Sequence, residues 1–186
     1  MSGNVMAIGQ KGKKMTPTEK TAHLWASGFV NRWHNNKHAE LRNSGDMVGG
    51  HAQRVAILYM ELFGNALGMV ETLRNLTVCI LHDAPESLSG DIPSPAKRIV
   101  PLLGTADKEA EAVYWDDMEE PNFSVKSREV ALCDFLDAIL FMMMHKPHLM
   151  KRADWSEDIE LCIEMAHGLG LGDEVVELIN YDWHKI

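Results

Sequence analysis

The sequence predicts an all-α protein with a compact globular fold of about seven or eight helices. Apolar residues recur at spacings of three and four over long stretches, which is the period of one helix face. No stretch sustains the alternation of apolar and polar residues that is typical of a half-buried strand. A chain of 186 residues suits one domain with its own core. We therefore expect a single domain over residues 16–186, preceded by a flexible tail over residues 1–15.

The first half of this domain contains three helix signals. Thr16 and Glu19 predict a helix start, because their side chains can form a capping box. A polar loop that contains glycines then leads into a second helix near His51. An apolar stretch that starts at Val70 ends near His82, and it predicts a third helix that is central and buried.

The second half contains further helix signals. One helix is predicted from Thr105 toward Glu120, and a mostly apolar one from Ser127 toward Met144. Ser156 predicts the cap of the next helix, and the glycines at 168, 170 and 172 predict a break before the last one.

Composition restricts the function classes. The formal net charge of -9 argues against a broad nucleic-acid surface, so polynucleotides are not expected as partners. A small anionic ligand remains compatible if a few cations converge locally. The three cysteines have no metal-binding spacing and indicate a reducing, cytoplasmic setting. The N-terminus lacks the apolar region of a signal peptide, and no apolar run reaches the ~18 residues that span a membrane, so a soluble protein is expected.

Four residues have the chemistry of a metal site: His51, the adjacent pair His82 and Asp83, and Asp134. Adjacent helical residues point about 100° apart, so this pair can bind one ion only near a helix end, which Pro85 favours. Two imidazoles and two carboxylates suit Mn, Fe, Co, Ni or Zn better than Ca. From these residues alone, metal ligation by Asp134 and a hydrogen-bonded structural role are equally good interpretations.

Longer blocks around these positions resemble those of the HD-domain metal-dependent phosphohydrolases. The blocks are RWH at residues 32–34, HDAPESLSGDIPSPAK at residues 82–97 and LCDFLDA around Asp134. The chain is most similar to the bacterial 5'-deoxynucleotidase branch and to the related bacteriophage dATP triphosphohydrolases. One departure is visible, because Gly49 and Gly50 precede His51 where the family commonly has a polar or acidic residue.

The resemblance implies a role for each matching residue, a cofactor and a substrate. The cofactor would be a divalent metal ion (Co, Mn, Zn, Fe, Ni or Mg), and the partner a small deoxynucleotide. The family also suggests a homo-oligomer, and the location would be the host cytoplasm if a phage encodes the chain. The implied residues are His51, His82, Asp83 and Asp134 for the metal, Glu86 and Asp91 for catalysis, Arg32 and Lys97 for phosphate, and Trp33 against the sugar, where it would exclude a 2'-hydroxyl.

The implied reaction is hydrolysis of the 5' phosphate ester of a deoxynucleotide. We favour a triphosphohydrolase that converts dATP into deoxynucleoside and triphosphate, for which Lys37, Arg42 and Arg98 are additional candidate cations. A 5'-deoxynucleotidase that acts on monophosphates is the alternative. An interpretation from another class is a non-catalytic, metal-containing, nucleotide-binding regulatory module.

Overall fold

The computed structural model describes residues 15–33, 39–92, 97, 99–115 and 125–185. Over these residues the protein is all-α, as predicted, and seven of its α-helices have nine residues or more. None of the described helices is both long and apolar enough to cross a membrane. The predicted tail, apart from Met15, lies outside the described residues, as do Lys37 and Arg98. The α-helices are α1 (Pro17–Ser27), α2 (Ala39–Arg42), α3 (Val48–Phe63), α4 (Met69–Leu81), α5 (Glu86–Ser89), α7 (Pro101–Trp115), α8 (Arg128–His145), α9 (Ala153–His167) and α10 (Gly172–Asn180).

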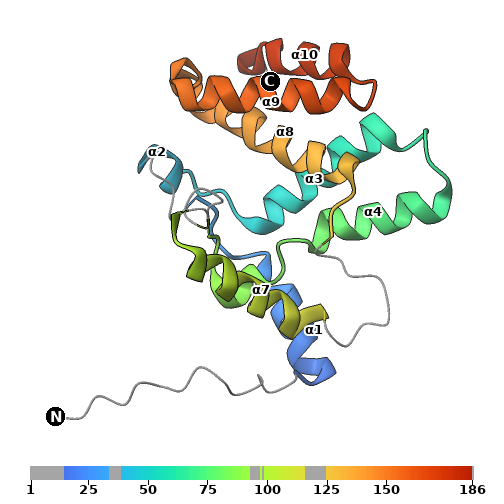
Figure 1. Ribbon diagram of the computed structural model, residues 1–186, viewed down its shortest axis with the longest axis vertical. Coiled ribbons are helices and arrows are strands. Elements are labelled where there is room, and N and C mark those ends of the chain that lie inside the picture. The colour runs from blue at the N-terminus through green and yellow to red at the C-terminus, as the bar shows by residue number, and fades with distance from the viewer. Residues whose placement is uncertain (1–14, 34–38, 93–96, 98, 116–124, 186) are drawn as a thin grey trace.

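Helices α3 and α8 pack against each other at the centre of the molecule (Figure 1). Helices α9 and α10 lie at one end, and α1 and α7 lie at the other. The main core surrounds α3 and α8, and its fully buried members include Val55, Tyr59, Leu132, Leu136 and Ile139.

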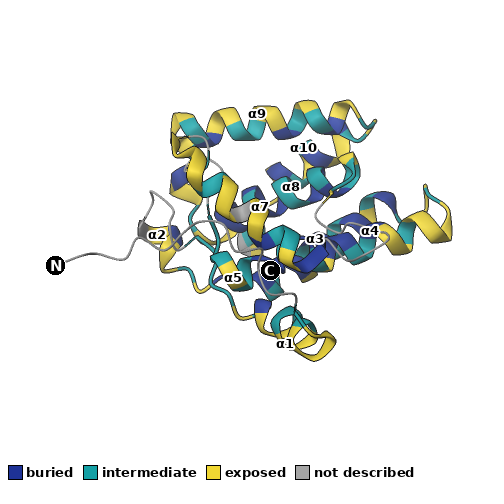
Figure 2. Cartoon of the chain, turned by 60° about the horizontal axis from the view of Figure 1, so that its bottom comes forward, coloured by how far each residue is buried: buried dark blue, intermediate teal, exposed yellow. Residues whose placement is uncertain are grey.

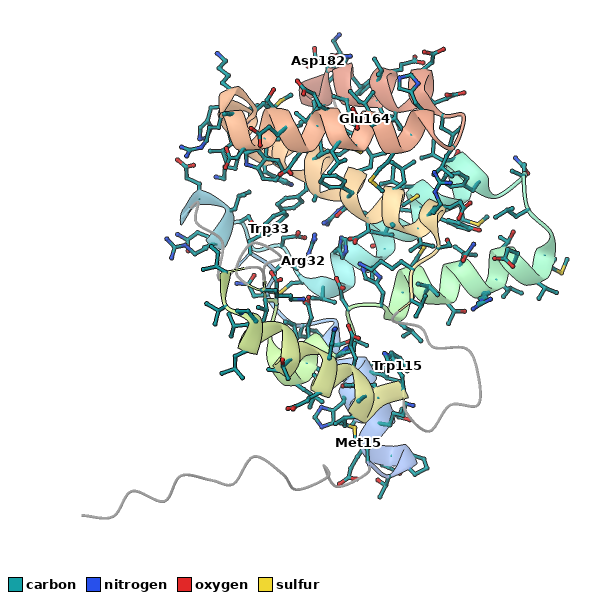
Figure 3. All side chains as sticks on the ribbon, in the orientation of Figure 1. Met15, Arg32, Trp33, Trp115, Glu164 and Asp182 are labelled. Carbon is teal, nitrogen blue, oxygen red and sulfur yellow. The ribbon has the colours of Figure 1, made fainter. Side chains whose placement is uncertain are left out.

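A second, smaller core joins α1, α5 and α7. It contains Ala84, Tyr114 and Trp115, with Leu24 packed against them. Figure 3 labels Trp115 at the end of α7, close to the start of α1. The end of α4 and the first turn of α3 carry three of the four predicted metal ligands, and α8 carries the fourth, Asp134.

Two predicted helix starts are confirmed. Thr16 caps α1, its side chain accepts from the Glu19 amide, and the Glu19 carboxylate accepts from the Thr16 amide at 2.8 Å. Ser127 caps α8 by accepting from the amide of Val130 at 3.3 Å. Most of α8 is buried, which agrees with its apolar sequence.

The prediction that α4 is a central, buried helix is wrong. Met69, Val70, Leu73 and Ile80 are between 57% and 84% exposed. Helix α4 packs chiefly on α3 and also touches α8, so only the side that carries residues such as Val78 is buried. Its apolar composition therefore reflects an apolar outer face in addition to a core face.

The predicted cap at Ser156 is also wrong. Helix α9 begins at Ala153, with Arg152 as its N-cap, and the Ser156 amide donates to the Arg152 carbonyl as a helical residue does. The short 3₁₀ helix Pro147–Lys151 leads directly into this start. Burial of Trp155 in the first turn fixes the start of α9, and this tertiary contact overrides the local preference of serine for a cap.

The glycines before His51 have a packing role. The Gly49 amide donates to the Gly28 carbonyl at 3.1 Å, and Val48 donates to Val30 at 2.9 Å. A Cβ atom on Gly49 would lie 3.0 Å from the Gly28 oxygen. The close approach of residues 28–30 to the start of α3 therefore favours glycine at position 49, because any side chain would push this backbone away.

Tyr59 and Asn75 join α3 to α4 by a buried hydrogen bond of 2.9 Å, in which the Asn75 amide donates to the Tyr59 hydroxyl. We expect Tyr59→Phe to lower the free energy of unfolding by about 1–3 kcal/mol, because the buried amide loses its acceptor. Urea denaturation measures this change. Tyr181→Phe, at an exposed tyrosine, is the matched control, and equal effects in the two variants would contradict the interpretation.

Candidate metal centre

The four predicted ligands come together from three helices. His51 lies in the first turn of α3, His82 and Asp83 lie at the end of α4, and Asp134 lies within α8. Ligand atoms of the first three residues lie within 4.8 Å of one another. The Oδ1 atom of Asp134 lies 3.0 Å from His51 Nε2 and 3.7 Å from His82 Nε2. These positions bring two imidazoles and the Asp83 carboxylate together, with the Asp134 carboxylate beside the imidazoles.

The adjacent residues His82 and Asp83 share this point because α4 ends there. Helix α4 ends at Leu81, His82 is its C-cap, and the Ala84 amide donates to the Leu81 carbonyl at 3.0 Å. Asp83 approaches both histidines, with Oδ2 3.4 Å from His51 Nε2 and Oδ1 3.2 Å from His82 Nε2. The predicted position of the pair at a helix end is confirmed.

Both imidazoles are held through Nδ1, which directs Nε2 toward the centre. His82 Nδ1 lies 3.1 Å from the carbonyl oxygens of Val78 and Cys79, and His51 Nδ1 lies 2.7 Å from Asp137 Oδ2. Because these oxygens only accept, each Nδ1 carries the hydrogen, and a neutral ring presents the lone pair of Nε2.

The two Nε2 atoms are buried and make no hydrogen bond. Asp134 Oδ1 approaches His51 Nε2 closely, but without the alignment of a hydrogen bond. Unpartnered buried nitrogens are rare in folded proteins, and beside two carboxylates they are the donor set of a transition-metal ion. The residues therefore fit a divalent metal that His51, His82, Asp83 and Asp134 would hold.

Burial and charge perturb the ionisation of these groups. Burial and the nearby Arg32 oppose protonation of His51, but Asp134, Asp137 and Asp83 outweigh them and raise its pKa to about 10. Burial also opposes ionisation of Asp134, yet the charge of Lys126 and the nearby imidazoles of His51 and His82 keep its pKa well below the usual range. The carboxylate of Asp134 is therefore held ionised, and the imidazole of His51 is held protonated.

Lys126 is a member of the centre that the sequence analysis missed. Its Nζ atom lies 2.5 Å from Asp134 Oδ2. Burial lowers its pKa, but the charges of Asp134 and Asp83 raise it more, so the net shift is upward. Lys126 precedes the α8 cap by one residue, and a lone lysine before a cap carries no sequence signal for this contact.

Asp137, one turn beyond Asp134 on α8, orients a predicted ligand. It holds His51 Nδ1, and its oxygens also accept from Arg54 at 2.6 and 3.1 Å. Arg32 approaches the same carboxylate at 3.4 Å. A carboxylate in this position fixes the ring and its tautomer, as it would for a histidine that binds metal.

A second buried aspartate, Asp46, extends this network and was not predicted. It accepts from Arg32 at 3.1 Å, from Arg54 at 2.9 Å and from the indole nitrogen of Trp33 at 3.0 Å. Arg54 lies one turn after His51 on α3, so its position on the same helix face could have suggested a role. Asp46 follows a glycine and has the sequence pattern of an ordinary turn.

The predicted substrate residues Arg32 and Trp33 lie on the segment between α1 and α2, in the middle of the molecule (Figure 3). The Trp33 ring stacks on Phe141 at 6.2 Å, and its φ of 65° is unusual for a residue other than glycine. Its backbone amide donates to Asp91 Oδ2 at 2.7 Å. Asp91 therefore joins the loop after α5 to the Arg32–Trp33 segment.

The two remaining predicted residues lie on either side of that loop. Glu86 begins α5, and its Oε2 is buried without a hydrogen-bond partner. Burial and the charges of Asp83 and Asp91 raise the pKa of Glu86 to about 9, so its carboxyl is protonated at neutral pH. Lys97 is partly buried next to α7, with its Cβ 3.9 Å from the Cβ position of Gly104.

Comparison with known proteins matches part of this scaffold to one family model. Residues 29–120 match the family model of the HD domain. The matched segment contains His51, His82 and Asp83, and Asp134 follows it on α8. Neither a curated protein nor a solved structure matches the chain. HD domains are generally metal-dependent phosphohydrolases, so the match indicates this class of activity.

We expect metal binding to release protons. The raised pKa of His51, about 10, keeps its imidazole protonated in the metal-free protein at neutral pH. Because a protonated histidine cannot bind metal, affinity should rise as the pH approaches about 10, by up to about tenfold per pH unit for each proton displaced. Calorimetric titration with Mn²⁺ in buffers of different ionisation enthalpy counts these protons. Binding heats that are identical in all buffers would contradict the expectation.

Proposed function

We propose that this protein catalyses metal-dependent hydrolysis of the 5' phosphate ester of deoxynucleotides. The observation that carries the proposal is the pair of buried, unpartnered Nε2 atoms of His51 and His82 beside Asp83 and Asp134. A divalent ion held there would polarise a phosphoryl oxygen and acidify an attacking water.

Glu86 is the proposed acid and base of the reaction. Its buried, protonated carboxyl lies one turn beyond Asp83, and its backbone amide donates to the Asp83 carbonyl at 3.0 Å. A protonated carboxyl next to the phosphate can donate to the leaving 5' oxygen as the ester bond breaks. Asp91 supports this role because its charge contributes to the raised pKa of Glu86.

Arg32 and Lys97 are the proposed phosphate ligands. Arg32 is 12% exposed at its side chain, and Asp46 and Asp137 fix its guanidinium group close to the metal-binding His51. A guanidinium that is already oriented loses little entropy when it binds phosphate. Trp33, anchored by Asp46 and Asp91, is the proposed wall against the sugar that favours deoxyribose.

The same bond gives different products from different nucleotides. A triphosphate would give deoxynucleoside and triphosphate, and a monophosphate would give deoxynucleoside and inorganic phosphate. We favour the triphosphohydrolase, with dATP as substrate, on the strength of the RWH block and the short chain. The 5'-deoxynucleotidase is the alternative. A homo-oligomer is proposed as the active form.

A non-catalytic, nucleotide-binding metalloprotein is the proposal from another class. It would use the same ligands and Arg32 but would not turn over substrate. The buried carboxyl of Glu86 favours the enzyme, because a binding module gains nothing from a protonated acid at the phosphate.

A nucleotide panel tests these proposals. Metal-loaded protein is incubated with deoxynucleoside and ribonucleoside mono- and triphosphates, and the products are separated by chromatography. Release of triphosphate supports the favoured enzyme, and release of inorganic phosphate from monophosphates alone supports the 5'-deoxynucleotidase. If no nucleoside is released but a nucleotide raises the melting temperature, the binding module is correct and the enzyme proposal is wrong.

Two variants test whether activity in this panel depends on the proposed ligand Asp83 and the proposed acid Glu86. Asp83→Ala should lose both metal and turnover. Glu86→Gln should keep the metal while kcat falls by about 10²–10⁴, because only the proton-transfer group is removed. Glu109→Gln, at an exposed glutamate on α7, is the matched control and should retain full activity.

A further inference from the structure

Lys126 occupies a position that bears on how many metal ions the centre can hold. Its Nζ atom lies 2.5 Å from Asp134 Oδ2, while Asp134 Oδ1 faces His51 and His82. The two side chains are 29% and 26% exposed, so the pair lies at the rim of the centre. One carboxylate oxygen is thus directed to the metal position and the other to an ammonium group.

Lys126 is held in this place by the start of α8. It directly precedes Ser127, whose hydroxyl caps the helix at Val130. Asp134 lies two turns further along the same helix. Lys126 therefore stands immediately before the cap of the helix that carries Asp134.

A centre with two metal ions needs oxygens that reach both ions, which lie about 3.5–4 Å apart. Both oxygens of Asp83 face the two histidines, at 3.4 Å and 3.2 Å from their Nε2 atoms. The outer oxygen of Asp134 is bound to Lys126. A second cation near this oxygen would also be repelled by the ammonium charge.

We propose that Lys126 makes this a single-ion centre by restricting Asp134 to one metal-facing oxygen. Lys126 is a positioning residue that acts on the metal through Asp134. The proposal takes its metal ligands from the proposed function, but it concerns metal stoichiometry and does not depend on the substrate.

The test is a substrate-free titration. Isothermal titration calorimetry with Mn²⁺, together with elemental analysis after gel filtration, gives the number of ions per chain for the wild type, Lys126→Met, Lys126→Gln and Lys126→Arg. Lys108→Met, at an exposed lysine on α7, is the matched control.

We expect one ion per chain for the wild type, Lys126→Arg and Lys108→Met. The two neutral variants should bind the first ion more tightly, on the order of tenfold, because a nearby positive charge is removed. They should also bind a second ion. In an active enzyme, kcat should fall in the same two neutral variants. A lysine with only a structural role would not give this combination of tighter metal binding and slower turnover.

Two ions per wild-type chain, or unchanged affinity and stoichiometry in folded Lys126→Met and Lys126→Gln, would overturn the proposal. Either result leaves the proposed hydrolysis intact. Conversely, a protein that hydrolyses no nucleotide but shows the expected titrations would refute the proposed function alone.

A separate observation concerns an apolar groove of about 500 Å³ between α1, α3 and α4. Its floor includes Gly49, Ala52 and Ala56, and Trp25 and Ile80 stand at its sides, 73% and 57% exposed. Figure 2 shows exposed residues along α1 and along α4. The exposed apolar side chains of this face are Trp25, Phe29, Ile57, Met60, Met69, Val70, Leu73 and Ile80.

We infer that this face binds a second copy of the chain. It presents a ridge, the edge-to-face pair Trp25 and Phe29 at 5.0 Å, directly beside the groove with small residues at its floor. A two-fold axis between ridge and groove would place each ridge in the partner's groove, as an isologous interface requires. Exposed apolar patches commonly mark protein–protein interfaces.

Light scattering after gel filtration tests the interface. The wild type should have twice the chain mass of 20.9 kDa, and Ile80→Arg and Trp25→Arg should be monomers. Leu161→Arg, at an exposed leucine on α9, is the matched control and should stay dimeric. A monomeric wild type, which would follow if another part of the chain covered the face, overturns the inference, as does a dimer that survives both groove variants.

Discussion

Helices α3, α4 and α8 bring a cluster of carboxylates together, and this cluster is stable only if positive charge lies close to it. Asp83, Asp134 and Asp137 surround the buried imidazoles of His51 and His82. Removing carboxylates from water is expensive unless opposite charges are close. In the metal-free protein the proton on His51 and the ammonium group of Lys126 supply that charge. A divalent ion can replace the protons, which ties the chemistry of the centre to the packing of its helices.

The same constraint explains the second layer around the centre. Two buried carboxylates, Asp46 and Asp137, are balanced by Arg32 and Arg54, which contact both of them. This closed network connects α3, α8 and the segment that carries Trp33. The carboxylate of Asp137 consequently contacts both His51 and the proposed phosphate ligand Arg32, which Asp46 also holds.

The extent to which sequence predicts these features depends on the range of the interaction. Caps at Thr16 and Ser127, and the placement of His82 and Asp83 at a helix end, follow from residues close in sequence. The start of α9 was missed because a tertiary contact of Trp155 determines it. The outer face of α4 was mistaken for core because an apolar residue looks the same in either place.

The residues of the candidate metal centre also divide into those that the sequence predicts and those that it does not. The sequence predicted His51, His82, Asp83 and Asp134 as ligands, and the HD-domain match covers the first three of them. Asp46 and Lys126 could not be predicted, since each meets its partners only after the chain has folded. The roles of Trp33 and Lys97 at a substrate stay predictions, because a stacked indole and a partly buried lysine are compatible with packing as well as with binding.

Helix α3 has one face in the core, next to the candidate metal centre, and another face that lines the outer groove. His51, Val55 and Tyr59 point into the core, while Gly49 and Ala56 line the groove on the other side. Residues on opposite sides of one helix cannot shift independently, because the backbone hydrogen bonds hold them in register. Gly49 also fixes the approach of residues 28–30, which lead directly to Arg32. Helix α3 therefore connects the groove with the predicted ligand His51, and its contact with residues 28–30 connects the groove with the segment that carries Arg32.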